Sequence, residues 1–399
     1  MNAVIKNYMV GADKGTVEQL EKMAASVACA DEVICVMPDG HLGKGCVVGS
    51  AITYTDKIVP FFVGVDVACT VSLWPIDNEL IDMAKIDALV HSKVPHGSAV
   101  RSIEHEYSES FPYERLYCWE FIDNHERSRL AMGSLGSGNH YISVNYDEAN
   151  DKYYLGIHCG SRNFGLQMAN YYQDVAIKCR DARIGSIKLV ADKLIQAARE
   201  RGEIQEIQKI LDTREHMISL EPVDDECYLE KGDMFNYLHD CDIIKSWVEL
   251  NHRVIAESIL FSLGQDVVEP YVVCTHNYVD TEDGIIRKGA IRAHDGDLCV
   301  IPLNMRDGTL VVRAKGNVEW NKSLPHGAGR VLSRAAAKRE LSLEQFRQDM
   351  SEVYSTCVLS ETIDESPRAY KPAEEIMKAI QGNGEIVCHL KEVYNFKAH

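Results

Sequence analysis

The 399-residue chain has no Ser/Gly-rich linker, no Pro-rich stretch, no low-complexity tract and no repeat at a fixed period. These absences exclude a solenoid and a string of tethered modules. With 46% hydrophobic residues, the chain can bury a large core. We expect one interleaved domain over residues 1–399, although length alone would also allow two or three.

The chain also lacks any CxxC pair among its 13 cysteines. An odd number of cysteines without such pairs argues against a disulfide framework and against a zinc knuckle. Its first residues, MNAVIKNYMVGADKG, have neither the basic start nor the apolar centre of a secretion signal. Reduced thiols and a cytoplasmic location are the simplest interpretation.

Long apolar runs are scarce, and the strongest one covers residues 58–76. It contains Asp66 and two prolines, and an aspartate at the middle of a bilayer costs roughly 2.5–3.5 kcal/mol. We therefore expect a buried strand and no membrane partner. This run raises a question of its own, because its centre, GVDVAC, holds an ionisable pair, Asp66 and Cys69.

Basic residues are also in deficit, since 42 Lys and Arg face 60 Asp and Glu and the net charge is −18. Such a balance usually speaks against nucleic-acid binding. The distribution is uneven, however. Residues 287–339 carry eleven basic and four acidic side chains, so a polyanion could still bind there.

The hydrophobic pattern predicts an α+β fold. We expect a helix over 15–28, strands and glycine-rich loops to about residue 75, and mostly helical structure over 78–130. A helical middle segment at about 166–264 should include one or two long surface helices over 183–215. Strands return after it, so we expect packed β-sheets flanked by helices.

Five segments place a His, Cys or Asp beside glycines near a strand end, and they are GVDVAC (Asp66, Cys69), GNH (Asn139, His140), GIHCGSR (His158), CTHNY (His276) and PHGAGR (His326). Thiolate, imidazole and carboxylate together suit zinc, manganese or iron. Asp66 and Cys69 cannot share a strand face at a spacing of three, so aiming both at one ion needs a bend at Ala68. The alternative is that each His is a hydrogen-bonded core residue and Cys69 a small hydrophobe.

PHGAGRVLSRAAAKRE predicts a helix from near Gly329 with Arg330, Arg334 and Lys338 on one face. A helix start with such cations suits phosphate, and the neighbouring His326 could accept a phosphoryl or nucleotidyl group. A solvated basic face is the alternative. Another loop, MPDGHLGKGCVVGS, holds Asp39, but its spacing is not that of a P-loop. It is either a ligand loop or a tight turn.

Taken in order, nine segments resemble the successive motifs of the RtcB family of RNA ligases: MPDGHLGKG, VGVDVAC, GSLGSGNH, IHCGSRNFG, THNY, RKGA, AKGN, PHGAGRVLSR and DESPRAYK. The resemblance covers about residues 30–397. It implies joining of an RNA 2′,3′-cyclic phosphate or 3′-phosphate to a 5′-hydroxyl RNA end. The implied cofactors are GTP and two manganese ions, with a histidine–GMP intermediate, and some relatives use an activating partner, archease.

Carried over position by position, the resemblance makes His326 the guanylylated nucleophile. The implied manganese ligands are Asp66, Cys69, His140, His158 and His276, with Cys69 bridging both ions. The implied nucleotide contacts are Asn139, Arg330, Tyr370 and Lys397, and Arg162 would lie with Arg330 near the phosphate path. Metal charge would then explain the buried ionisable pair at Asp66 and Cys69.

Three departures from the family pattern predict a divergent branch. Ser143 stands where most members have a glutamate that reads the guanine edge, which puts strict GTP selectivity in question. PLNMRDG replaces the family's PGSMG stretch, and Ala398 and His399 follow Lys397 where the family ends in Lys-Gly. Together with the helical stretch 183–215, these suggest an altered RNA preference.

Two rival functions use the same residues differently. A metal-dependent phosphodiesterase or cyclic phosphatase acting on RNA ends would need the metal ligands but not His326. A non-catalytic RNA-binding relative would need neither, although degenerate copies tend to lose ligands first.

Overall fold

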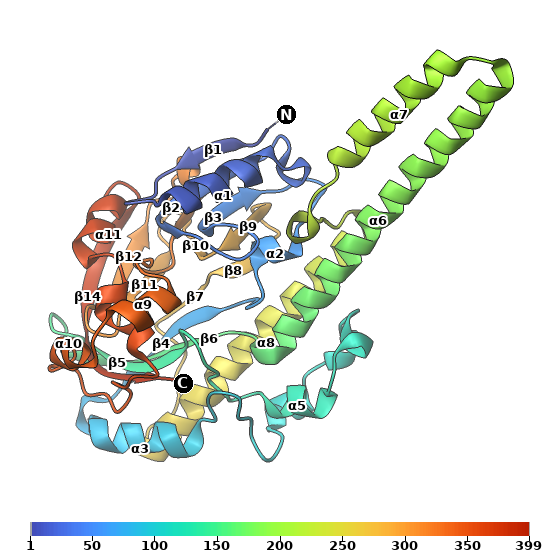
Figure 1. Ribbon diagram of the computed structural model, residues 1–399. Helices are drawn as coiled ribbons and strands as arrows, with labels where there is room; N and C mark the ends of the chain where they lie inside the picture. The colour runs from blue at the N-terminus through green and yellow to red at the C-terminus, as the bar shows by residue number, and fades with distance from the viewer. Residues whose placement is uncertain (1, 399) are drawn as a thin grey trace.

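Two β-sheets packed against each other form the body of the molecule, and helices cover their outer faces (Figure 1). The structure is a computed structural model that describes residues 2–398. A shared apolar core joins the sheets, with Cys35 and Ala51 from one sheet beside Val71 and Val311 from the other. The expected α+β class is confirmed.

The larger sheet has seven strands that pair antiparallel throughout. Their order is β11 (Leu298–Asn304), β12 (Gly308–Ala314), β14 (Gly384–Lys397), β5 (Tyr141–Asp147), β6 (Lys152–Cys159), β4 (Thr70–Ile76) and β7 (Val272–Thr275). The sheet curls until its edge strands meet, and the Val300 backbone N–H on β11 donates to Cys274 Sγ on β7 at 3.2 Å. This curvature brings strand ends from distant parts of the chain to one place.

The second sheet lies beside this curled sheet. Its order is β1 (Val4–Asn7), β2 (Val33–His41), β3 (Val48–Thr53), β9 (Ile285–Lys288) and β8 (Asn277–Asp280). Only β1 and β2 pair parallel. A short ribbon pairs β10 (Ala290–Arg292) with β13 (Ser323–Pro325), which leads directly into His326.

The two faces of the seven-stranded sheet have different chemistry. On one face, Ile142, Val144, Tyr394 and Phe396 pack with the apolar sides of two helices, α3 (Met83–Lys93) and α8 (Lys231–Leu263). Because side chains alternate along a strand, the neighbouring residues of β5 and β14 face the other way. That second face is polar, and it forms one wall of the site described below.

The helical middle segment is confirmed, and it begins at residue 162 rather than 166. It comprises α6 (Arg162–Arg201), α7 (Ile204–Ser219) and α8. Gly202, with φ +72°, ends α6 and lets the chain reverse into α7. Figure 1 shows the two antiparallel helices extending well beyond the sheets.

Other expected elements need correction. Residues 94–124 are largely irregular rather than helical, with only the short α4 (Glu106–Glu109) between α3 and α5 (His125–Leu130). The apolar run 58–76 is split between α2 (Pro60–Val63) and β4, because a proline begins a helical turn and Gly64, at φ +97°, ends it. No helix in residues 2–398 is long and apolar enough to cross a membrane.

The remaining helices flank the sheets. They are α1 (Lys14–Ala25), α9 (Arg334–Glu340), α10 (Leu343–Asp349) and α11 (Ala373–Ile380), with 3-10 turns at Val27–Cys29, Asn78–Leu80, Tyr113–Arg115, Trp119–Phe121, Asp224–Glu226, Val318–Trp320, Ile363–Glu365 and Pro367–Ala369. Helix α9 starts at Arg334, not near Gly329, because Gly329 has φ +75° and Ser333 caps the helix by accepting from the Ala336 N–H. All 13 cysteines are free thiols, as expected.

We predict that the tip of the α6–α7 hairpin opens before the core. No residue of α7 is buried, whereas α8 buries Trp247, Ile255 and Ile259. Helical stability in proteins comes mostly from packing, so α7 amides should exchange with solvent roughly 100-fold faster than those in the middle of α8. Hydrogen exchange read by mass spectrometry measures this. Equal protection of both helices would contradict it.

Candidate metal centre

The site begins with a sharp bend ahead of β4. Ala68 has φ +58°, a left-handed conformation that is uncommon for a residue other than glycine. Its N–H donates to the Asn277 carbonyl at 2.6 Å, and the Cys69 N–H donates back to the Asp66 carbonyl at 3.2 Å. The bend expected at Ala68 is therefore present, and it turns both Asp66 and Cys69 toward the same site.

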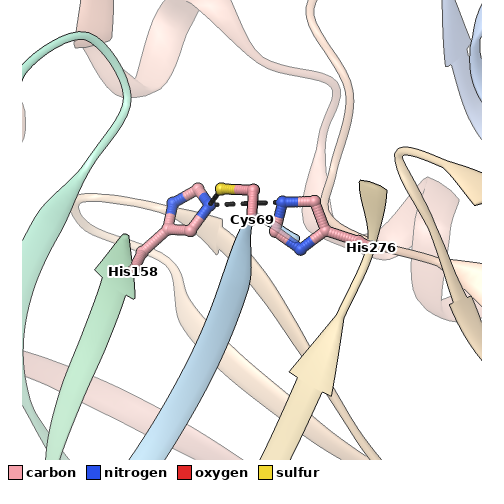
Figure 2. Close-up of side chains that lie close together, drawn as sticks. All are labelled: Cys69, His158 and His276. Atoms are coloured by element: carbon pink, nitrogen blue, oxygen red, sulfur yellow. Dashed lines mark hydrogen bonds between the residues drawn. The ribbon is translucent and has the colours of Figure 1, made fainter. Parts of the chain in front are cut away.

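Three other strand ends deliver imidazoles to the same place. His140 directly precedes β5, His158 is the penultimate residue of β6, and His276 lies between β7 and β8. Figure 2 shows His158 and His276 on either side of Cys69. Cys69 Sγ lies 3.2 Å from His158 Nε2 and 3.6 Å from His140 Nε2. His158 Nε2 is 3.4 Å from His276 Nε2.

These five residues form two triads of potential metal ligands that share Cys69: Cys69, His158 and His276 in one, and Asp66, Cys69 and His140 in the other. Within each triad, the potential ligand atoms all lie within 4.8 Å of one another. A cysteine, imidazole and carboxylate set of this kind suits a borderline transition metal, and a shared sulfur suits two neighbouring ions. The cluster can therefore hold metal.

Hydrogen bonds orient one of the imidazoles. His140 Nδ1 lies 3.0 Å from the Leu135 carbonyl, an acceptor, so Nδ1 carries the proton and Nε2 faces Asp66 Oδ2 at 2.9 Å. His158 Nδ1 and His276 Nδ1 are buried and have no hydrogen-bond partner. A glycine gives the carboxylate its space, because a Cβ at residue 160 would lie 2.0 Å from Asp66 Oδ1.

Burial sets the protonation of these groups. It lowers the pKa of His158 and of His276 well below the ordinary value, and neighbouring histidines add to the effect. Both imidazoles are therefore neutral and offer lone pairs. Burial, with the nearby Asp66 carboxylate, raises the pKa of the Cys69 thiol. A cation would have to displace that proton, so metal affinity should rise with pH.

His326 lies beside this cluster, held by a partner that the sequence did not reveal. Its Nδ1 is 2.7 Å from Asp39 Oδ2, and Asp39 is fully buried. The His326 and His276 ring centroids are 4.9 Å apart. The backbone approaches closely here, because a Cβ at Gly329 would lie 2.3 Å from the Asp39 carbonyl oxygen. Asp39 thus holds the Nδ1 proton and leaves Nε2 on the opposite edge of the ring.

A cavity of about 740 Å³ opens over the candidate metal ligands and His326. Its walls include Asp66, Cys69, His158, His276 and His326, together with the expected nucleotide contacts Asn139, Arg330, Tyr370 and Lys397. Arg162 does not line it. The Arg162 guanidinium instead donates to Ser134 Oγ at 3.2 Å and to the Gly97 carbonyl at 3.1 Å, which places it behind the His140 loop.

Glu365 organises one side of the cavity, and the sequence analysis missed it. Its carboxylate lies 2.9 Å from Lys397 Nζ, accepts from Tyr370 Oη at 2.7 Å and from Arg334 at 2.6 Å, and pairs with Arg330 at 3.3 Å. Burial opposes the charge, yet these cations and the phenol hold the pKa of Glu365 at about 2. Glu365 is therefore ionised at every physiological pH.

The predicted stripe of three cations on one helix face is wrong, because these side chains pair with acidic residues. Arg330 lies outside α9 in a bridge with Tyr370, and Arg334 and Lys338 pair with Asp364 at 2.7 and 3.6 Å. Arg287, in the same basic third of the sequence, is fully buried against Asp280 and Asp283. Much of the positive charge over 287–339 is thus paired with acidic side chains of the same chain.

Comparison with known proteins shows the family of the chain. The sequence profile of the family described as "tRNA-splicing ligase RtcB" matches residues 19–117 and 118–398. The chain belongs to the RtcB family. The RNA-splicing ligase RtcB of Escherichia coli K12 is 29% identical over 400 residues, which cover 90% of this chain and 88% of that protein. The tRNA-splicing ligase RtcB of Archaeoglobus fulgidus is 26% identical over 474 residues, covering 97% and 92%. Identities this low mark the chain as a divergent RtcB.

We predict that cobalt(II) added to the purified protein gives a thiolate-to-cobalt charge-transfer absorbance that Cys69→Ser abolishes. Serine keeps the size of the side chain but removes the sulfur common to both triads. Cys388→Ser, on β14 and outside both triads, is the matched control and should retain the band. Titration followed in the near ultraviolet measures it, and a band that survives Cys69→Ser would place the metal elsewhere.

Proposed function

We propose that this chain is a GTP- and manganese-dependent RNA ligase. It joins RNA ends bearing a 2′,3′-cyclic phosphate or 3′-phosphate to RNA ends bearing a 5′-hydroxyl, in RNA repair or tRNA splicing, through a histidine–GMP intermediate on His326. The single observation that carries this proposal is the juxtaposition of two ligand triads that share Cys69 with a histidine held by a buried carboxylate, at a cavity lined by Cys69 and that histidine.

The proposed first step uses the geometry of His326 and Asp39. With its proton held on Nδ1 by Asp39, the imidazole presents the Nε2 lone pair to the α-phosphorus of GTP. A nitrogen–phosphorus bond forms, the bond to the bridging oxygen breaks, and pyrophosphate leaves. Asp39 stabilises the positive charge that develops on the ring, as the buried carboxylate of a catalytic triad does.

The later steps exchange phosphoryl partners without redox change. An RNA 3′-phosphate oxygen attacks the histidine-bound phosphorus, so GMP passes to the RNA end and the imidazole is restored. The 5′-hydroxyl oxygen then attacks the RNA 3′-phosphorus, a phosphodiester forms, and GMP leaves. A cyclic end is first opened by water to the 3′-phosphate.

The donor set fits two manganese ions. Each triad combines imidazole nitrogen with the shared sulfur, and one triad also contains a carboxylate. Asp66, Cys69 and His140 would hold one ion, and Cys69, His158 and His276 the other. Bound there, the ions supply electrostatic stabilisation of the transferring phosphoryl group. A soft sulfur ligand favours a transition metal over magnesium.

We assign nucleotide contacts to Asn139, Arg330, Tyr370 and Lys397, which line the same cavity. Lys397 Nζ also donates to the Asn139 carbonyl at 2.9 Å, so these two contacts are mechanically linked. The cytoplasmic location, an activating partner such as archease, and one ligase domain over residues 1–399 stay predictions from the sequence.

We predict that His326→Ala abolishes RNA joining and nucleotide labelling, a loss of at least about 10³-fold, because the nucleophile is gone. Manganese content should not change. His216→Ala, an exposed histidine on α7, is the matched control and should ligate normally. Ligation of 2′,3′-cyclic phosphate RNA and transfer of label from α-labelled GTP measure the effect. A protein that opens cyclic ends but never takes up GMP, with or without His326, would instead be a phosphodiesterase.

We predict that Asp39→Asn slows nucleotide labelling by about 10²- to 10⁴-fold, because an amide can donate to Nδ1 and favour the wrong tautomer. Quenched-flow labelling with GTP gives the rate, and metal analysis should show unchanged manganese. A labelling rate within twofold of the unaltered protein would remove Asp39 from the mechanism.

A further inference from the structure

The polar face of β14 carries a carboxyl group that the proposed mechanism does not use. A β-bulge between Glu392 and Tyr394 inserts one extra residue into β14 opposite β5. Because of this bulge, Glu392 and Asn395 stand on the same face of the sheet despite a spacing of three. Both line the cavity that contains His326, and Lys397 follows on the same face.

Hydrogen bonding leaves this wall rich in acceptors. Asn395 Nδ2 donates to Glu392 Oε1 at 2.6 Å, which uses amide donor capacity within the wall. Asn395 Oδ1 is buried and has no partner, and Asn395 itself is only 2% exposed. Beside them on β5, Asn145 Nδ2 donates to Ser143 Oγ at 2.6 Å, and neither residue lines the cavity. Buried acceptors without partners are rare, so Asn395 Oδ1, on a residue that lines the cavity, is placed to accept a hydrogen bond from a ligand.

Burial of the Glu392 carboxyl group is unfavourable for folding. Glu392 is 7% exposed, and burial raises its pKa to about 8, although Asn395 and Lys397 oppose the shift. Tyr141 on β5 is a further titratable group that interacts with it, and burial keeps that phenol protonated by raising its pKa. A buried carboxyl with a displaced pKa in a cavity is typical of a functional site.

Among the bases, guanine matches such a wall. Its Watson–Crick edge presents two adjacent donors, N1–H and the N2 amino group, whereas adenine, cytosine and uracil each present one donor beside an acceptor. A carboxylate accepts both guanine donors at once. We propose that Glu392, positioned by Asn395, is the residue that recognises the guanine base. This inference rests on the proposed function and names the specificity element of the same site.

The proposal reverses an expectation from the sequence. Ser143 in place of a glutamate suggested relaxed selectivity, but Ser143 faces Asn395 directly across the β5–β14 ladder. The carboxylate is then contributed by the neighbouring strand instead of β5. Ser143 itself is fully buried and packs against Gly156 on β6, where a Cβ would lie 2.4 Å from Ser143 Oγ.

The test compares three nucleotides on manganese-loaded protein. Calorimetry with the α,β-methylene analogues of GTP, ITP and ATP measures binding without transfer to His326. ITP lacks only the N2 amino group, so the expected order of affinity is GTP, then ITP, then ATP. Glu392→Gln should cut the preference for GTP over ATP by about ten- to hundredfold, the worth of one bidentate contact to a base. Glu385→Gln, exposed on the same strand, is the control and should change nothing.

The unaltered protein provides a second readout that needs no variant. Guanine requires the ionised carboxylate, and with a pKa of about 8 this form is the minority at pH 6.5. The ratio of GTP to ATP affinity should therefore rise from pH 6.5 to 8.5. Titration of the phosphates and of the metal ligands changes the affinities for GTP and ATP equally, so it does not change their ratio. In Glu392→Gln the ratio should be flat with pH.

Opposite results overturn the inference. They are a GTP-to-ATP ratio that Glu392→Gln leaves within twofold, a preference for ATP, or no binding of any of the three analogues. Failure of the ligase proposal looks different, because it is the absence of covalent GMP on His326 when unmodified GTP is supplied. Labelled His326 with an unaltered ratio in Glu392→Gln would keep the ligase and remove the base contact.

Discussion

One sulfur atom organises this protein. Cys69 Sγ is the potential ligand common to both triads, and its neighbours arrive from the ends of β4, β5, β6 and β7. Three imidazoles, a thiol and part of a carboxylate are removed from water there, and burial of that kind is unfavourable unless a cation compensates it. The curled seven-stranded sheet provides the rigid frame that holds these strand ends together, and the left-handed turn at Ala68 provides the local distortion.

The second constraint comes from two buried carboxylates, each of which fixes the proton or the position of side chains in the cavity. Asp39 fixes the proton on His326, and Glu365 fixes Tyr370, Arg330 and Lys397. Both act through hydrogen bonds in a low-dielectric setting, where such bonds are strong and their loss is costly. A net negative charge is therefore compatible with a phosphate-binding cavity. The carboxylates near the cavity are buried and paired with cations or an imidazole, so they orient these groups.

Short-range patterns predicted much of this arrangement. Glycine-flanked Asp66, Cys69, His140, His158 and His276 were identified from the sequence, and so was the bend at Ala68. Long-range pairs were out of reach, since Asp39 and His326 are 287 residues apart and no spacing rule links them. Helical periodicity misplaced Arg330 because the positive φ of Gly329 interrupts it. The segment 94–124 looked helical from its polarity, but it is held by turns and by aromatic packing such as Tyr113 on Trp119.

The bulge in β14 gathers three cavity residues on one strand, apart in sequence from the other site residues. Glu392, Asn395 and Lys397 come from a single C-terminal strand, whereas the candidate metal ligands and His326 come from elsewhere in the sequence. If the strand recognises the base as proposed, substitutions along it would alter nucleotide preference without changing the candidate metal ligands or His326. On the proposed function, base preference could change in evolution, or be redesigned, independently of the residues assigned to phosphoryl transfer.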